Sequence, residues 1–109
     1  MTPKTFRKYL DRDWYCWHCG REDGTLIPQH RLNRGSGGSK VRDVPSNIIV
    51  FCAEANSRAE SDSRFAAECR VNGWKLSSWQ NPLLTPVYDV MTRKWYFLDD
   101  EFGRTLTSV

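Results

Sequence analysis

Four polar residues in the middle of the chain have types and spacing that could hydrolyse a phosphodiester bond: His30, Asn47, Asn56 and Glu60. Such hydrolysis needs a group that activates water and a cation for the charge that develops. An imidazole such as that of His30 can take a proton from water near neutral pH. Asn56 and Glu60 are four residues apart, so on a helix they share one face. Their oxygens suit a hard cation such as Mg²⁺.

A stretch without hydrophobic periodicity separates His30 from Asn47. Residues 31–46 contain three Gly, one Pro and four basic residues, a composition that predicts a long functional loop. Its cations suit a DNA backbone, and the front half of the chain is basic as a whole. Residues 1–42 hold nine Lys and Arg against four Asp and Glu, a formal charge of +5. We predict DNA contacts from Arg31, Arg34, Lys40 and Arg42, and a hydrogen bond from Asn47 across the loop closure.

The order and spacing of these residues resemble the HNH endonucleases, and more closely the short HNH proteins of tailed phages of actinobacteria. Asn47 and Asn56 are nine residues apart and Asn56 and Glu60 four, which are the steps of that family. The closer likeness is carried by Ile27-Pro28-Gln29-His30-Arg31, Arg34-Gly35-Ser36-Gly37-Gly38-Ser39, Ser46-Asn47, Glu60-Ser61-Asp62, Gly73-Trp74-Lys75 and Trp95-Tyr96-Phe97-Leu98-Asp99-Asp100. The resemblance covers about Cys16 to Arg104.

The resemblance implies a ββα-metal core and a metal-dependent DNA endonuclease, a hydrolase of phosphodiester bonds. His30 would then be the general base and Asn47 its catalytic partner. One divalent cation (Mg²⁺ or Mn²⁺, with Ni²⁺ as a further candidate) would be held by Asn56, Glu60 and Gln29. The implied partners are DNA and phage packaging proteins, and the implied location is the host cytoplasm.

Two positions depart from the family pattern. The residue before the base is often Asp or His and here is Gln29, and the first helix ligand is often His and here is Asn56. Only Glu60 would bring a formal charge to the metal. A second hypothesis therefore stays open, in which the chain is a DNA- or protein-binding module of HNH fold with weak or no catalysis.

The cysteines indicate a second metal site. Cys16 and Cys19 form a C-x-x-C pair, and many HNH proteins carry two such pairs around a structural zinc. Cys52 could open the second pair, but its partner position holds Ala55, and Cys69 lies 17 residues beyond Cys52. Zinc on Cys16, Cys19 and Cys52, with His18 or water as the fourth ligand, is therefore one alternative. A third hypothesis is that the whole chain is a small zinc-ribbon structural protein.

These residues must be positioned by helices and strands. The expected order of these elements along the sequence predicts an α+β fold in one domain, residues 1–109. We expect a Cys-containing knuckle over 12–24, a ββα core over 25–72 and a small antiparallel β extension over 73–104. The predicted helices are 3–11, capped by Thr2, and 57–71, where Ser57 and Glu60 match a capping box. The predicted strands are 25–28, ended by a proline, and 47–52, 74–79, 86–90 and 95–98.

Simpler structural roles compete with the chemical ones at three positions. Glu60 could serve only in that capping box, Asn56 only as a helix cap, and Asn47 only as a turn residue. The chain has no apolar run long enough to span a membrane, and its first residues lack the apolar stretch of a signal peptide. We therefore expect a cytoplasmic protein without a membrane partner.

Overall fold

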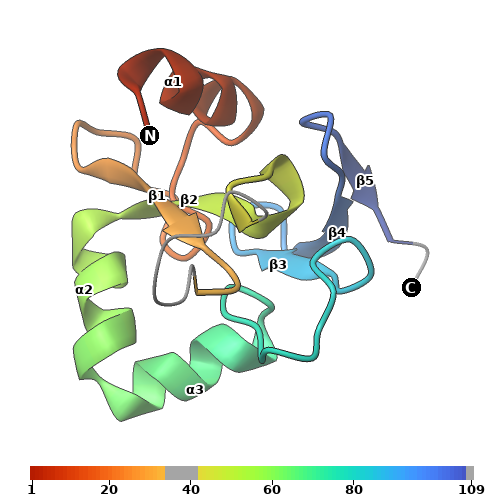
Figure 1. Cartoon of the computed structure of the whole chain (residues 1–109). Helices are drawn as coiled ribbons and strands as arrows, with labels where there is room; N and C mark the ends of the chain where they lie inside the picture. The colour runs from red at the N-terminus through yellow and green to blue at the C-terminus, as the bar shows by residue number, and fades with distance from the viewer. Residues whose placement is uncertain (34–41, 108–109) are drawn as a thin grey trace.

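The computed structural model describes residues 1–33 and 42–107, and over these it is an α+β fold with three α-helices and two small antiparallel sheets. In Figure 1, α2 and α3 run along one side, the second sheet lies on the other, and α1 lies above the first sheet. The elements are α1 (Pro3–Arg12), β1 (Leu26–His30), the 3₁₀ turn η2 (Pro45–Asn47), β2 (Ile48–Cys52), α2 (Ala53–Ser61), α3 (Ser63–Val71), β3 (Val87–Asp89), β4 (Lys94–Leu98) and β5 (Arg104–Leu106).

The first sheet pairs β1 with β2, so that Leu26 faces Cys52 and His30 faces Ile48. Every residue of β2 is buried, as the run of β-branched and apolar side chains in that strand predicts. The expected first strand was wrong at its end, because β1 continues through Pro28 to His30. Proline is tolerated there because a strand of a two-stranded sheet has a free edge.

The predicted helix over 57–71 is two helices. The first begins four residues early, because Cys52 is the cap and its Sγ accepts a hydrogen bond from the N–H of Ala55 at 3.3 Å. The second begins after Asp62, whose backbone is extended and whose carboxylate accepts from the N–H groups of Arg64 and Phe65. The capping box of Ser57 and Glu60 is therefore wrong, since both residues lie inside α2.

The second sheet has the order β3-β4-β5. The expected strands at 86–90 and 95–98 correspond to β3 and β4, whereas no strand forms at 74–79 and β5 was not predicted. The helix expected over 3–11 is confirmed as α1, with Thr2 as cap and Pro3 in its first turn. Gly73 lies two residues after the end of α3. Its φ of +74° is a left-handed conformation that favours glycine.

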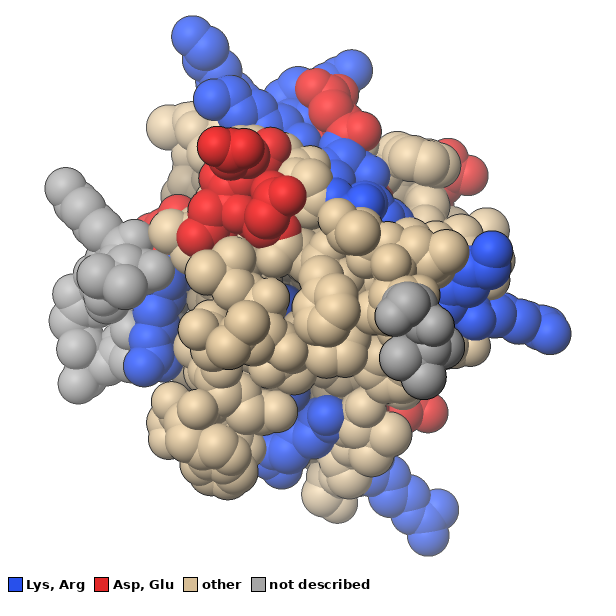
Figure 2. All heavy atoms as spheres, turned by 90° about the vertical axis from the view of Figure 1, so that its right-hand side faces the viewer, with Lys and Arg blue, Asp and Glu red and all other residues tan. Residues whose placement is uncertain are grey.

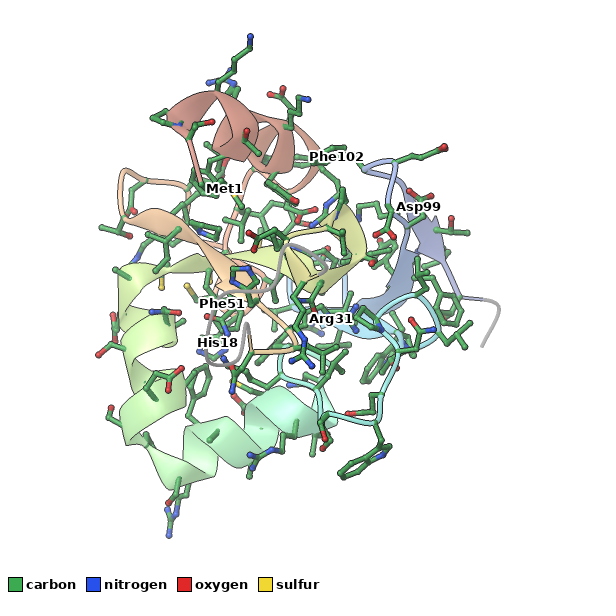
Figure 3. All side chains as sticks on the ribbon, in the orientation of Figure 1. Met1, His18, Arg31, Phe51, Asp99 and Phe102 are labelled. Carbon is green, nitrogen blue, oxygen red and sulfur yellow. The ribbon has the colours of Figure 1, made fainter. Side chains whose placement is uncertain are left out.

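The core lies between the first sheet, α3 and the segment after it. Phe51, Phe65 and Trp74 are nearly inaccessible, and their ring centroids lie 5.7 to 6.5 Å apart. The imidazole of His18 packs against the same group, 4.6 Å from Phe65 and 5.4 Å from Trp74. Figure 3 shows His18 and Phe51 together on the side of the sheet that faces α3. Among the described residues, no helix is long and apolar enough to cross a membrane.

Candidate functional site

His30 is the last residue of β1 and is only partly shielded from solvent, with 20% of its side chain exposed. Its Nε2 lies 2.6 Å from Oδ1 of Asp43. An ionised carboxylate only accepts hydrogen bonds, so the imidazole nitrogen is the donor in this contact. The end of β1 thus carries an imidazole whose Nε2 is held by a carboxylate.

Asn47 ties together both ends of the segment between β1 and β2. Its Oδ1 accepts from the N–H of Leu32 at 2.7 Å, and its Nδ2 donates to the carbonyls of Leu32 at 3.1 Å and Arg42 at 2.9 Å. Its backbone N–H donates to Val44 O, and its carbonyl accepts from Arg31 N–H. Asn47 is 1% exposed. The residue therefore makes hydrogen bonds across the loop closure and is more than a turn residue, while its catalytic role stays a prediction.

Arg31 is fully buried, which corrects the expectation that it contacts DNA. Its guanidinium donates to four backbone carbonyls, those of Gly73, Ser46, Pro82 and Thr85, at 2.7 to 3.1 Å. Burial, with the charge of Arg12 adding to it, lowers the pKa of Arg31 to about 9, so the group still carries its charge at neutral pH. Figure 3 shows Arg31 in the interior of the molecule. With four of five N–H donors engaged, its role is to hold the segment after α3 against the end of β1.

The other three predicted DNA contacts divide into two groups. Arg34 and Lys40 lie outside the described residues. Arg42 is half-buried, and its guanidinium donates to the carbonyl of Asn33. Arg42 therefore helps Asn47 to join the two ends of the loop, and part of the Arg42 side chain stays accessible.

Asn56 and Glu60 lie in α2, four residues apart, and so share one side of that helix. Asn56 is half-buried and is the fourth residue of the helix, and the helix cap is Cys52. The cap role proposed for Asn56 is therefore wrong. Glu60 is exposed, and its Oε1 lies 3.6 Å from Nζ of Lys75. The same ammonium lies 3.1 Å from Oδ1 of Asn33, so one cation brings α2 beside the segment that follows His30.

Gln29 is 3% exposed, and its Nε2 donates to the carbonyl of His30 at 3.2 Å. Successive side chains of a strand point to opposite faces, so Gln29 and His30 leave β1 on different sides. Of the three predicted metal ligands, Gln29 is the one that is fully buried and bonded to the backbone.

The sulfur atoms of Cys16, Cys19 and Cys52 lie within 4.8 Å of one another and could hold a metal ion. Among the described residues, this is the one group of three or more His, Cys, Asp and Glu side chains that meets that condition. The Sγ atoms of Cys19 and Cys52 are 3.8 Å apart. Burial raises the pKa of the Cys16 thiol to about 12, a preference for the neutral form that a bound cation would reverse.

A fourth ligand for this cysteine group is not among the described cysteines. Cys69 is buried elsewhere in α3, and Ala55 stands where a second C-x-x-C pair would place a thiol. A pocket of about 230 Å³ opens beside Cys19 and Cys52, and His18 forms part of its wall. Nδ1 of His18 is buried, has no hydrogen-bond partner among the described residues and lies 3.9 Å from Oε2 of Glu68. Desolvation by burial lowers the pKa of this imidazole.

Two residues near the candidate base escaped the sequence analysis. Asp43 is an acidic residue inside a basic loop, and its distance of 13 positions from His30 gave no reason to pair them. Lys75 belongs to the quoted Gly73-Trp74-Lys75 motif but had no assigned role. The sequence offered one weak signal for Asp43, which is the single acidic residue among four basic residues in the segment 31–46.

Figure 2 looks at the molecule from the side that carries the second sheet. Lys and Arg lie mostly toward the margins of this face, Asp and Glu form one larger group and several smaller ones, and much of the centre holds other residue types. This face therefore carries no continuous cationic surface among the described residues.

Comparison with protein families, with curated proteins and with solved structures finds no match to this chain.

Proposed function

We propose that the chain is a metal-dependent DNA endonuclease of HNH type, with β1, β2 and α2 as a ββα-metal core. The observation that supports the proposal is a set of contacts around the end of β1. His30 ends β1, Asn47 closes the loop beside it, and Lys75 brings Glu60 of α2 next to Asn33. The simpler roles of Asn56 and Glu60 as helix caps are removed, which strengthens the case for chemistry at both.

In the proposed reaction the imidazole of His30 takes a proton from water. The water oxygen forms a bond to phosphorus, and the bond from phosphorus to the 3′ oxygen breaks. The leaving 3′ oxygen takes a proton from solvent, so the products are a 3′ hydroxyl and a 5′ phosphate. Arg34, Lys40 and Arg42 would hold the DNA backbone during this step.

A divalent cation would supply charge stabilisation at the phosphate. Asn56 and Glu60 would hold it with two oxygen atoms, which is the donor type that Mg²⁺ and Mn²⁺ prefer. Gln29 fits this set less well, because it is buried and its amide nitrogen is engaged with the backbone carbonyl of His30. The chain would therefore bring few ligands of its own, and DNA phosphates would complete the shell.

The test is cleavage of supercoiled plasmid with Mg²⁺, Mn²⁺ or Ni²⁺ by the wild type and by His30→Ala. We expect the wild type to nick or linearise the plasmid and the variant to lose this activity, with an unchanged melting temperature. Arg70→Ala serves as the control, since it removes an exposed side chain of α3 that lies outside the proposed site. Cleavage by His30→Ala at the wild-type rate would show that another group activates the water.

One observation favours a second candidate, a DNA-binding module without efficient catalysis. The only carboxylate of the proposed metal site, Glu60, is paired with the ammonium of Lys75. A cation that binds there must compete with this lysine. DNA binding by the wild type without cleavage under any of the three metals would support this candidate over the nuclease.

We further propose that Cys16, Cys19 and Cys52 hold a structural zinc ion that ties the knuckle to the start of α2. Three thiolates supply three of the four ligands that such sites use. His18 or water would be the fourth. This zinc would be separate from the divalent cation of cleavage.

A further inference from the structure

We propose that Asp43 is the positioning residue of His30, and that Nδ1 of His30 is the nitrogen that accepts the proton from water. The inference rests on the proposed nuclease function. It concerns a carboxylate that contacts the imidazole and has no other place in the mechanism.

The contact itself assigns the protons on the ring. Nε2 of His30 lies 2.6 Å from Oδ1 of Asp43, a distance typical of a charge-assisted hydrogen bond. An ionised carboxylate has no proton to give, so Nε2 carries the hydrogen. In a neutral imidazole the other nitrogen then has the free lone pair. Nδ1 is therefore the base, and the developing imidazolium is stabilised by the carboxylate behind it.

The backbone around Asp43 is held from both sides by one residue. Nδ2 of Asn47 donates to the carbonyl of Arg42, and the backbone N–H of Asn47 donates to the carbonyl of Val44 at 2.9 Å. Asp43 lies between these two anchored residues. Asn47 also binds Leu32, two residues after His30. The buried side chain of Asn47 thus fixes the backbone next to Asp43 relative to the end of β1, which carries His30.

Anchored backbone, rather than burial, distinguishes this pair from freely moving surface charges, because Asp43 is exposed and His30 is only partly buried. The side chains of His30 and Asp43 are 20% and 36% exposed. Exposed ion pairs add little to stability because water screens them and long side chains lose freedom. Here both side chains are short, and anchored backbone lies on both sides. The arrangement therefore suits orientation of the ring rather than stabilisation of the fold.

The experiment compares wild type, Asp43→Ala and Asp11→Ala as full-length chains labelled with ¹⁵N in histidine. Asp11→Ala removes the same charge from an exposed site on α1. Only His18 and His30 contribute signals, and a His18→Gln variant assigns them. Spectra at about pH 9, where imidazole is ordinarily neutral, report which ring nitrogen carries a slowly exchanging proton. Plasmid cleavage on the same samples gives kcat and KM.

We expect a protected Nε2–H on His30 in wild type and in Asp11→Ala, and its loss in Asp43→Ala. We expect kcat of Asp43→Ala to fall about 10- to 100-fold, as when the carboxylate behind a functional histidine is removed, with KM little changed. A protected Nδ1–H in wild type, an Nε2–H that survives in Asp43→Ala, or an unchanged kcat would overturn the inference. If the wild type cuts no DNA, the nuclease proposal fails, and the spectra alone decide whether Asp43 orients the ring.

Discussion

At the scale of single residues, substitutions of Asn56 best distinguish an effect on cleavage from an effect on the stability of the fold. The residue lies inside α2, where it caps nothing, and alanine is the better helix former. Asn56→Ala should therefore keep or raise the free energy of unfolding, by about 0.5 kcal/mol, while cleavage falls. Asn56→His should preserve or raise cleavage with Mn²⁺ or Ni²⁺, because imidazole suits those ions.

Melting temperature and cleavage rate, measured on the same three samples, test this prediction. A loss of stability in Asn56→Ala with full cleavage activity would remove Asn56 from the metal site. Ser57→Ala is the control, since Ser57 is an exposed neighbour in the same helix.

Ala55 is the residue that tests the proposed zinc site. It is 1% exposed and follows Cys52 by three positions, so Ala55→Cys would create the second C-x-x-C pair. We expect this variant to hold zinc more tightly than wild type and to resist removal of the metal by a chelator. When zinc is present at about 100 times its Kd, the stabilisation of the folded chain is about 2.7 kcal/mol.

Zinc titration of wild type, Ala55→Cys and Ala55→Ser provides the measurement. Serine has nearly the size of cysteine but no thiol, so it separates ligation from packing. Equal zinc affinity in all three chains would show that position 55 does not face the metal.

At the scale of elements, the junction between the two sheets depends on Arg31. This side chain joins the end of β1 to the segment between α3 and β3 through three carbonyl bonds, and to η2 through a fourth. Arg31→Lys should lower the free energy of unfolding by about 3 kcal/mol or more, because one ammonium cannot reach four separated carbonyls and leaves some of them unpaired. Arg70→Lys, at an exposed position of α3, should stay within about 0.5 kcal/mol of wild type.

Urea unfolding of the three chains decides this point. A change below about 1 kcal/mol for Arg31→Lys would mean that water replaces the lost bonds without cost, so that the guanidinium does not hold the junction.

The elements that the sequence predicted well are those with a strong local signal. The buried run Ile48–Cys52 and the Thr2-Pro3 start of α1 are both present. The start of α2 was misplaced because a cysteine is an uncommon cap and its sulfur is a weak acceptor. The break at Asp62 was missed because its residues have ordinary helix propensity, and only the side-chain bonds of Asp62 mark it.

The candidate site was predictable in its residue types and only partly in its contacts. Glu60 lies in a helix as expected, whereas His30 ends a strand expected to stop at Pro28, Asn47 lies in η2 before the strand, and Asn56 lies inside a helix expected to begin after it. Arg31 was misjudged because a basic residue beside a glycine-rich loop is usually exposed, and its four acceptors come from 15 to 54 positions away. Asp43 and Lys75 were missed for the same reason, since tertiary contacts define them.

At the scale of the whole molecule, the charge is unevenly distributed. The net charge is +3, whereas residues 1–42 alone carry +5, so the basic part coincides with α1, the knuckle and the loop. If the loop meets the DNA backbone, Arg34→Ala with Lys40→Ala should weaken binding to all sequences. The slope of log affinity against log salt concentration should become shallower by about 1.8.

The double variant Lys4→Ala with Lys8→Ala is the matched control, because it removes two cations from exposed positions of α1. Fluorescence anisotropy over a range of salt concentrations provides the slopes. Equal changes in both variants would show that the affinity reports total charge rather than contacts from the loop.

The closure of the loop between β1 and β2 has a consequence for protein engineering. Asn47 donates to the carbonyl of Leu32, and Arg42 donates to the carbonyl of Asn33. These bonds join the two ends of the loop without using the residues between 34 and 41. Doubling the length of a flexible loop costs only about 0.6 kcal/mol once its ends are held. The span from Arg34 to Val41 could thus serve as an exchangeable cassette. Libraries of other lengths and sequences could be grafted there to seek new target preferences, with the imidazole and its frame left in place.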